Sequence, residues 1–96
     1  MVIEFDPDKS AENFRKHRIA FSEVELAFYD DHAQTIEDSD SQGEQRLTVL
    51  AMDGQGRLLV ICFTERGENI RVISARKASP AEAKTYDEKR LRLQQR

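Results

Sequence analysis

The sequence contains few cysteines, prolines and glycines: one, two and four, respectively, among 96 residues. A single cysteine cannot form an internal disulfide. The longest uninterrupted apolar run, Leu58–Phe63, has six residues, whereas a membrane-spanning helix needs about 20. The N-terminus lacks the basic start and the apolar core of a secretory signal. We therefore expect a cytoplasmic protein that makes no use of a membrane.

The chain contains enough hydrophobic residues for one small core. Hydrophobic residues make up 39% of the chain and charged residues 34%, which is too apolar for global disorder. A chain of this length is too short to divide into two independent cores. The sequence therefore predicts a single domain over residues 1–96.

Charge is unevenly distributed along the chain, although the net charge is only −3. Residues 1–40 hold eleven acidic and four basic side chains, which gives −7, and residues 41–96 hold seven acidic and eleven basic ones, which gives +4. Such asymmetry permits a basic surface that binds phosphates. The alternative is that the charges form two ordinary solvated faces.

The N-terminal half predicts a short strand and two helices. Val2–Phe5 is prone to form a strand, and Asp6 with Pro7 is a typical helix start. We expect a helix over Pro7–His17, with Ala11 and Phe14 facing inward. A capping box at residues 22–25 predicts a second helix over Glu23–Tyr29.

The segment that follows, residues 30–43, is polar and acidic. Its composition favours an exposed loop over Asp38–Gly43, and any strand within Ala33–Glu37 should be short.

From Arg46 onward the pattern predicts strands joined by tight turns. Asp53–Gly56 separates a strand ending at Met52 from an apolar strand over Arg57–Thr64, which should lie in the centre of the sheet. Turn residues 65–69 then lead into a strand over Ile70–Lys77. Strict alternation would place the side chains of Ile70, Val72, Ser74 and Arg76 on one face and those of Arg71, Ile73, Ala75 and Lys77 on the other.

The last element is a helix over Pro80–Leu93, because Ser79, Pro80 and Glu82 form a capping box with proline in the first turn. Its inner stripe should contain Ala83, Tyr86 and Arg90. The order strand, two helices, three strands and a helix predicts an α+β domain with an antiparallel sheet.

Several common kinds of catalytic site are missing from the sequence. Cys62 lies alone in a strand, and His17 and His32 lack the spacing of metal ligands. Cys62 is best explained as a core residue, with a Cys/His nucleophile as the alternative. Gly54 and Gly56 belong to a hairpin turn rather than to a phosphate-binding loop. We expect no bound metal.

Arginine is the one residue type that points to a site. Five arginines fall within 31 residues at strand ends and turns, where their guanidinium groups could converge on phosphates; they are Arg46, Arg57, Arg66, Arg71 and Arg76. The alternative is that they protect strand edges from aggregation or pair with Glu44, Glu65 and Glu68.

A set of short motifs spread over nearly the whole chain matches a known protein family. The motifs are Phe5 and Asp6, Lys9, Asn13, Lys16 and His17, Ile19–Phe21, Phe28, Asp30, Gly43–Arg46, Gly56–Val60, Thr64–Arg66, Ile70–Ala78, Glu82 and Tyr86. In this order and spacing they resemble the BrnT family of toxins from bacterial type II toxin–antitoxin systems. That resemblance implies a RelE-like α+β fold and ribonuclease activity without a metal or any other cofactor.

The resemblance also implies partners and site residues. The partners would be an RNA substrate and a small antitoxin with a ribbon-helix-helix DNA-binding part, so that a hetero-oligomer reaches operator DNA only through the antitoxin. Arg66 and Arg76 match positions expected to matter for toxicity. Arg71 joins them as a catalytic candidate, and Arg46 and Arg57 are candidates for RNA binding.

RNA cleavage by the ribose 2′-hydroxyl also needs a general base and a general acid. His17, Lys77, Glu44 and Tyr86 are the candidates, and histidine has the pKa best matched to neutral pH. We expect His17 in catalysis and Lys77 in RNA binding. Alternatively, His17 only interacts with the end of its helix and Tyr86 only packs.

A second function remains open at this point. The isoelectric point of about 5.4 weakens non-specific attraction to RNA. The chain could therefore be a non-catalytic partner that binds the antitoxin and acts as a co-repressor of its operon. In either case the C-terminal helix and an edge of the sheet are the expected partner-binding surfaces.

Overall fold

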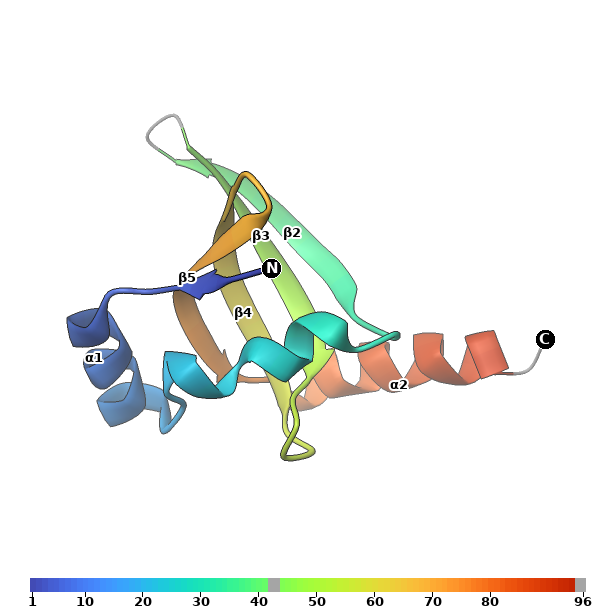
Figure 1. Ribbon diagram of the computed structural model, residues 1–96. Helices are drawn as coiled ribbons and strands as arrows, with labels where there is room; N and C mark the ends of the chain where they lie inside the picture. The colour runs from blue at the N-terminus through green and yellow to red at the C-terminus, as the bar shows by residue number, and fades with distance from the viewer. Residues whose placement is uncertain (42–43, 95–96) are drawn as a thin grey trace.

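The computed structural model describes the backbone of residues 1–41 and 44–94 and the side chains of residues 1–36 and 45–92. In chain order the elements are β1 (Ile3–Glu4), α1 (Pro7–His17), the 3-10 helices η1 (Phe21–Glu23) and η2 (Glu25–Tyr29), β2 (Gln34–Ser41), β3 (Glu44–Met52), β4 (Leu58–Arg66), β5 (Asn69–Lys77) and α2 (Pro80–Gln94). The strands form one sheet in the order β1-β5-β4-β3-β2, in which only the pairing of β1 with β5 is parallel. The predicted α+β fold is confirmed (Figure 1).

Helix α1 has the predicted bounds because its capping signals are strong. The Asp6 carboxylate accepts a hydrogen bond from the Asp8 N–H at 2.8 Å. The helix ends at Arg18, which adopts the left-handed conformation with φ 62° and donates its N–H to the carbonyl of Phe14. Helices commonly end in this conformation.

The inward face predicted for α1 is wrong. Ala11 is exposed and Phe14 is 43% exposed, whereas Ser10 and Asn13 are buried. The reason is that α1 packs against main-chain groups: Ser10 Oγ accepts from the Phe21 N–H at 2.9 Å. Polar side chains are favoured where a helix must satisfy buried backbone donors and acceptors.

Asn13 extends the edge of the sheet. Its Nδ2 donates to the carbonyls of Ala75 at 2.8 Å and Ile19 at 2.7 Å, and its Oδ1 accepts from the Ala75 N–H at 3.2 Å. One side-chain amide therefore occupies the place on β5 that a neighbouring strand would take beyond the end of β1. This contact fixes α1 against the sheet.

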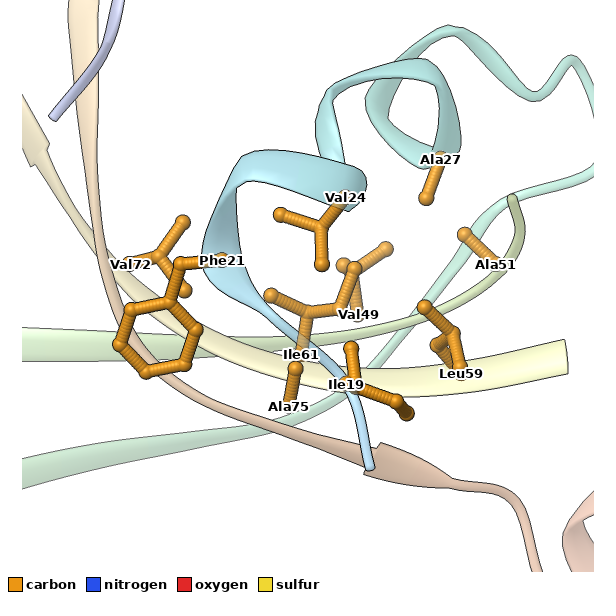
Figure 2. Close-up of a cluster of buried hydrophobic side chains, with 10 residues drawn as sticks. All are labelled: Ile19, Phe21, Val24, Ala27, Val49, Ala51, Leu59, Ile61, Val72 and Ala75. Atoms are coloured by element: carbon orange, nitrogen blue, oxygen red, sulfur yellow. The ribbon is translucent and has the colours of Figure 1, made fainter. Parts of the chain in front are cut away.

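The second N-terminal helix forms as two successive 3-10 helices rather than one α-helix. Phe21, Val24 and Ala27 are all buried and lie three residues apart, which is the repeat of a 3-10 helix. Figure 2 shows these three side chains directed at the sheet. The first 3-10 helix also starts earlier than the capping box predicted at residues 22–25, because the Glu23 carboxylate accepts a hydrogen bond from the Ala20 N–H at 3.0 Å.

The exposed loop predicted over Asp38–Gly43 is wrong for its described residues. β2 runs from Gln34 to Ser41 and pairs antiparallel with β3, with an irregularity between Thr35 and Glu37; Gln42 and Gly43 lie outside the described residues. A polar strand is stable at this position because the outer edge of β3 needs hydrogen-bond partners for its backbone.

The sheet separates a large core from a small one. The large core lies between the sheet and the 3-10 helices and consists of Ile19, Phe21, Val24, Ala27, Val49, Ala51, Leu59, Ile61, Val72 and Ala75 (Figure 2). On the opposite face, Tyr86 of α2 packs against Leu50 and Val60. β4 is buried on both faces, as its continuous apolar run predicts.

Strict alternation along β5 is interrupted by a bulge. Cys62 of β4 lies opposite Ser74, but the next residue, Phe63, lies opposite Val72. Ile73 is therefore an extra residue in β5, and it reverses which side chains share a face. The predicted division of this strand is wrong: Val72 and Ala75 both lie in the large core.

Among the described residues, no helix is long and apolar enough to span a membrane.

Candidate functional site

The β5 bulge places the arginines of three strands on one face of the sheet. Opposite partners share a face, so Arg71 lies beside Thr64 and Arg76 beside Val60, which belongs to the α2 side. Alternation along β3 and β4 adds further polar residues to this side. We name the resulting surface the arginine face; its members are Arg46, Thr48, Cys62, Thr64, Arg66, Arg71, Ser74 and Arg76.

Helix α2 covers only one end of this side of the sheet. Its buried contact is Tyr86 with Leu50 and Val60, and partly buried Met52, Leu58 and Ala78 complete the cluster. Toward the other end, Arg66 and Ser74 are exposed and Arg71 is half-buried. The arginine face is therefore open to solvent at the end that α2 does not cover.

Arg46 is half-buried on this face, and its Nε is buried without a hydrogen-bond acceptor among the described residues.

Arg76 is held by a carboxylate of α2. Its Nη1 and Nη2 donate to Glu82 Oε1 and Oε2 at 2.8 and 3.0 Å, a bidentate ion pair. Glu82 also accepts from the Ser79 N–H at 2.8 Å, which confirms the predicted capping box. The hydrogen bonds from Arg76 and Ser79 lower the pKa of Glu82 to about 2. The sequence contains the capping signal, but not the fact that the same carboxylate reaches Arg76.

Arg57 lies apart from the arginine face. It follows the turn before β4, and its Nε donates to Asp53 Oδ2 at 2.7 Å while its Nη2 lies 3.6 Å from Glu23 Oε2. Burial raises the pKa of the Asp53 carboxyl, but hydrogen bonds from Arg57 and Gln55 outweigh burial and lower the pKa overall. This arginine joins the turn to the 3-10 helices.

Lys77 also points away from the arginines. It lies opposite Leu59, whose side chain belongs to the large core, so alternation directs Lys77 to the other side of the sheet.

Tyr86 is tied into the structure by its hydroxyl. Tyr86 is 2% exposed, and its O–H donates to Asp30 Oδ2 at 2.6 Å. The same oxygen of Asp30 accepts from the Met52 N–H at 2.8 Å. Burial and the bond to Asp30 raise the pKa of the Tyr86 hydroxyl. This arrangement gives Tyr86 a packing and anchoring role.

His17 lies at the exposed end of α1 and lines a groove between this helix and β5. The groove has a volume of about 280 Å³ and is lined by Lys9, Glu12, Asn13, Lys16, His17, Ile73 and Ser74. Ser74 belongs to both the groove and the arginine face, so the two surfaces are continuous. Lys9, one of the family motif residues, also lines this groove, although the sequence assigned it no role in a site.

Cys62 does not have the core role expected from the sequence. Cys62 is half-buried on the arginine face rather than part of either core. In the described part of the chain, no three His, Cys, Asp or Glu side chains gather as metal ligands.

In the part of the chain that the structure describes, a small α+β sheet thus presents several arginines on its open face. The structure is similar to the crystal structure of the Brucella abortus ribonuclease toxin BrnT: the match covers 82% of this chain and 97% of that chain, with 26% sequence identity and a TM-score of 0.64. The comparison with curated protein sequences found no match.

The family model described as "Ribonuclease toxin, BrnT, of type II toxin-antitoxin system" matches residues 5–82. The chain belongs to this family. It is a ribonuclease toxin of a type II toxin–antitoxin system, and it has a cognate antitoxin as partner.

Proposed function

We propose that the chain is a metal-independent endoribonuclease of the cytoplasm that cleaves RNA on the arginine face. The observation that carries this proposal is the shared placement of Arg66, Arg71 and Arg76 on the open side of the sheet. Guanidinium groups stay protonated at neutral pH and bind phosphate oxygens in pairs, so they stabilise charge without transferring protons.

In this reaction the 2′-hydroxyl of one nucleotide attacks the adjacent phosphorus. The bond from the 2′ oxygen to phosphorus forms and the bond from phosphorus to the 5′ oxygen breaks. The base takes the proton of the 2′-hydroxyl and the leaving 5′ oxygen takes a proton from water, so that a 2′,3′-cyclic phosphate and a 5′-hydroxyl result. Charge accumulates on the phosphate oxygens in the transition state. Arg66 and Arg71 are assigned to this charge, and Arg46 to holding the strand.

Arg76 is assigned to the RNA backbone at the α2 end of the arginine face, in an orientation set by Glu82. A bidentate carboxylate holds a guanidinium rigidly, which lowers the entropy lost when the remaining donors bind RNA.

The base assigned to the 2′-hydroxyl is His17. The groove that it lines reaches the arginine face at Ser74, and imidazole exchanges protons at neutral pH. Of the other candidates, Tyr86 is buried with a raised pKa, and Lys77 lies across from Leu59 on the core side. The side chain of Glu44 lies outside the described residues.

The antitoxin in this proposal carries a ribbon-helix-helix part and brings the toxin to operator DNA as a hetero-oligomer. Two surfaces support such an interaction. β2 is the outer strand of the sheet and can offer backbone groups to a partner strand, and Leu91 on α2 is 49% exposed.

The test compares RNA cleavage by wild type, Arg66→Ala, Arg71→Ala and the matched control Arg92→Ala, which removes the same charge from an exposed position on α2. Cleavage should fall by at least about tenfold in the first two variants, as loss of an electrostatic stabiliser costs about 10²–10³ in rate in known enzymes. The control should match wild type. Cleavage should persist in EDTA and fall between low and moderate salt.

Loss of cleavage on chelation would refute the metal-independent mechanism, and equal activity of all variants would refute the assignment of the arginines. If the folded protein binds its antitoxin but cleaves no RNA under any condition, the co-repressor function replaces the nuclease.

A further inference from the structure

The groove between α1 and β5 occupies a gap in the edge of the sheet. Pairing of β1 with β5 ends at Glu4 opposite Arg71, and Asn13 takes over the edge at Ala75. Between these two points lies the bulge, with Ile73 and Ser74 in the groove wall. Bulges next to functional sites redirect side chains out of the regular sheet.

The other wall of the groove is a basic stripe of α1. Lys9 and Lys16 are seven residues apart and so lie on the same side of the helix. Glu12 lies between them, and its Oε1 is 3.0 Å from Lys16 Nζ. The hydrogen bond from Lys16 lowers the pKa of the Glu12 carboxyl. Glu12 therefore offsets the charge of one lysine and leaves the stripe with a net positive charge.

The geometry points to this groove as a second phosphate-binding subsite, which takes the RNA backbone where the strand leaves the arginine face and crosses the edge of β5. The inference rests on the proposed function, because it extends the same RNA strand. Ser74, shared by both surfaces, marks the crossing point. Lys9 supplies the main charge, and Lys16 contributes in proportion to its release from Glu12.

An RNA strand fits these observations better than an acidic protein segment. The groove is continuous with a face whose cations are guanidinium groups, which match the paired oxygens of a phosphodiester. Backbone phosphates recur at regular spacing, so a strand held on the arginine face must place further phosphates beyond its edge.

The experiment measures binding of a labelled single-stranded RNA of about 12 nucleotides with 2′-O-methyl groups, which lack the attacking hydroxyl. Wild type is compared with Lys9→Ala and Glu12→Gln, each at two salt concentrations. The matched controls are Lys89→Ala and Glu88→Gln, which change the same charges at exposed positions of α2, a helix that Figure 1 shows running away from α1.

Lys9→Ala should weaken binding and lower the slope of log affinity against log salt by about one phosphate contact. Its deficit relative to wild type should therefore shrink about threefold between roughly 50 and 200 mM salt. Glu12→Gln should have the opposite effect, with tighter binding and a steeper slope, because Lys16 is released. The two controls should stay close to wild type.

If wild type binds the RNA and the Lys9 and Glu12 variants match it, the subsite is refuted and the proposed function stands. Equal shifts in the α2 controls would also refute the subsite, since binding would then follow net charge alone. Poly-glutamate that competes as well as RNA of equal charge would assign the groove to an acidic protein segment. Failure of the folded wild type to bind RNA at all would overturn both the subsite and the proposed function.

Discussion

Replacing Asn13 tests the claim that one side-chain amide attaches α1 to the sheet. The residue is 7% exposed, and its amide makes three hydrogen bonds to main-chain groups of Ile19 and Ala75. Asn13→Ala leaves two carbonyls and one N–H without this partner. A buried polar group left unsatisfied costs about 1–3 kcal/mol.

The groove beside Asn13 admits water to part of this region, so the lower end of that range applies to each group. The expected loss is then about 3 kcal/mol, a large share of the roughly 5–15 kcal/mol that stabilises a typical domain. At about 4–8 °C per kcal/mol, the melting temperature should fall by about 12–24 °C. Urea denaturation should show a midpoint lower by about 1–3 M.

A second substitution at the same position separates hydrogen bonding from packing. Asn13→Asp keeps the shape, but a carboxylate cannot donate to the carbonyls of Ile19 and Ala75 and is repelled by them. The folded state therefore favours the protonated acid and raises its pKa. The stability of this variant relative to wild type should be higher at pH 4 and decrease as the pH rises toward 7.

The matched control is Asn69→Ala, because Asn69 Oδ1 accepts one exposed hydrogen bond from the Val2 N–H at 3.1 Å. Its loss should cost under about 1 kcal/mol. If Asn13→Ala costs no more than this control, or if the stability of Asn13→Asp does not depend on pH, the Asn13 amide does not attach α1 to the edge of β5.

Three further predictions concern α2 and a turn. Tyr86→Phe removes the hydrogen bond to Asp30 and should lower the free energy of unfolding by about 1–2 kcal/mol in urea, while RNA cleavage per folded molecule stays unchanged; a loss of cleavage alone would contradict its anchoring role. The stability that Glu82 supplies is present above its ordinary pKa of 4.5 and is lost as the pH falls toward about 2. The free energies of unfolding of wild type and Glu82→Gln should therefore converge in acid. A difference between them that stays constant with pH would contradict the ion pair with Arg76. Gly67 has a φ of 63°, and Gly67→Ala should cost about 1–2 kcal/mol in thermal unfolding. A variant as stable as wild type would show that the turn relaxes instead.

The local signals in the sequence were sufficient for most element boundaries. The start of α1 depends on Asp6 and Pro7, and that of α2 on Ser79 and Glu82, all within one helical turn of the residues they cap. The apolar run of β4 likewise predicts its central position. These features could be predicted because capping and burial patterns involve neighbours in sequence.

Features that depend on partners distant in sequence were missed. β2 looks like a loop from its own composition, and only the open edge of β3 makes it a strand. The buried face of α1 is polar because Asn13 meets Ala75, which lies 62 residues away. Hydrophobic periodicity places apolar residues in the interior, and it does not predict a polar side chain that hydrogen-bonds to the edge of a sheet.

The candidate site shows most clearly which features follow from local sequence and which depend on tertiary packing. The sequence by itself determined that the chain carries clustered arginines and the motifs of a ribonuclease toxin. Alternation would have separated Arg71 from Arg76, and only the extra residue Ile73 in β5 brings them to the same face. Whether a strand contains a bulge is decided by how both neighbouring layers pack, with Val72 and Ala75 both drawn into the large core. Tertiary packing therefore decided which arginines form one surface and which, like Arg57, stabilise a turn.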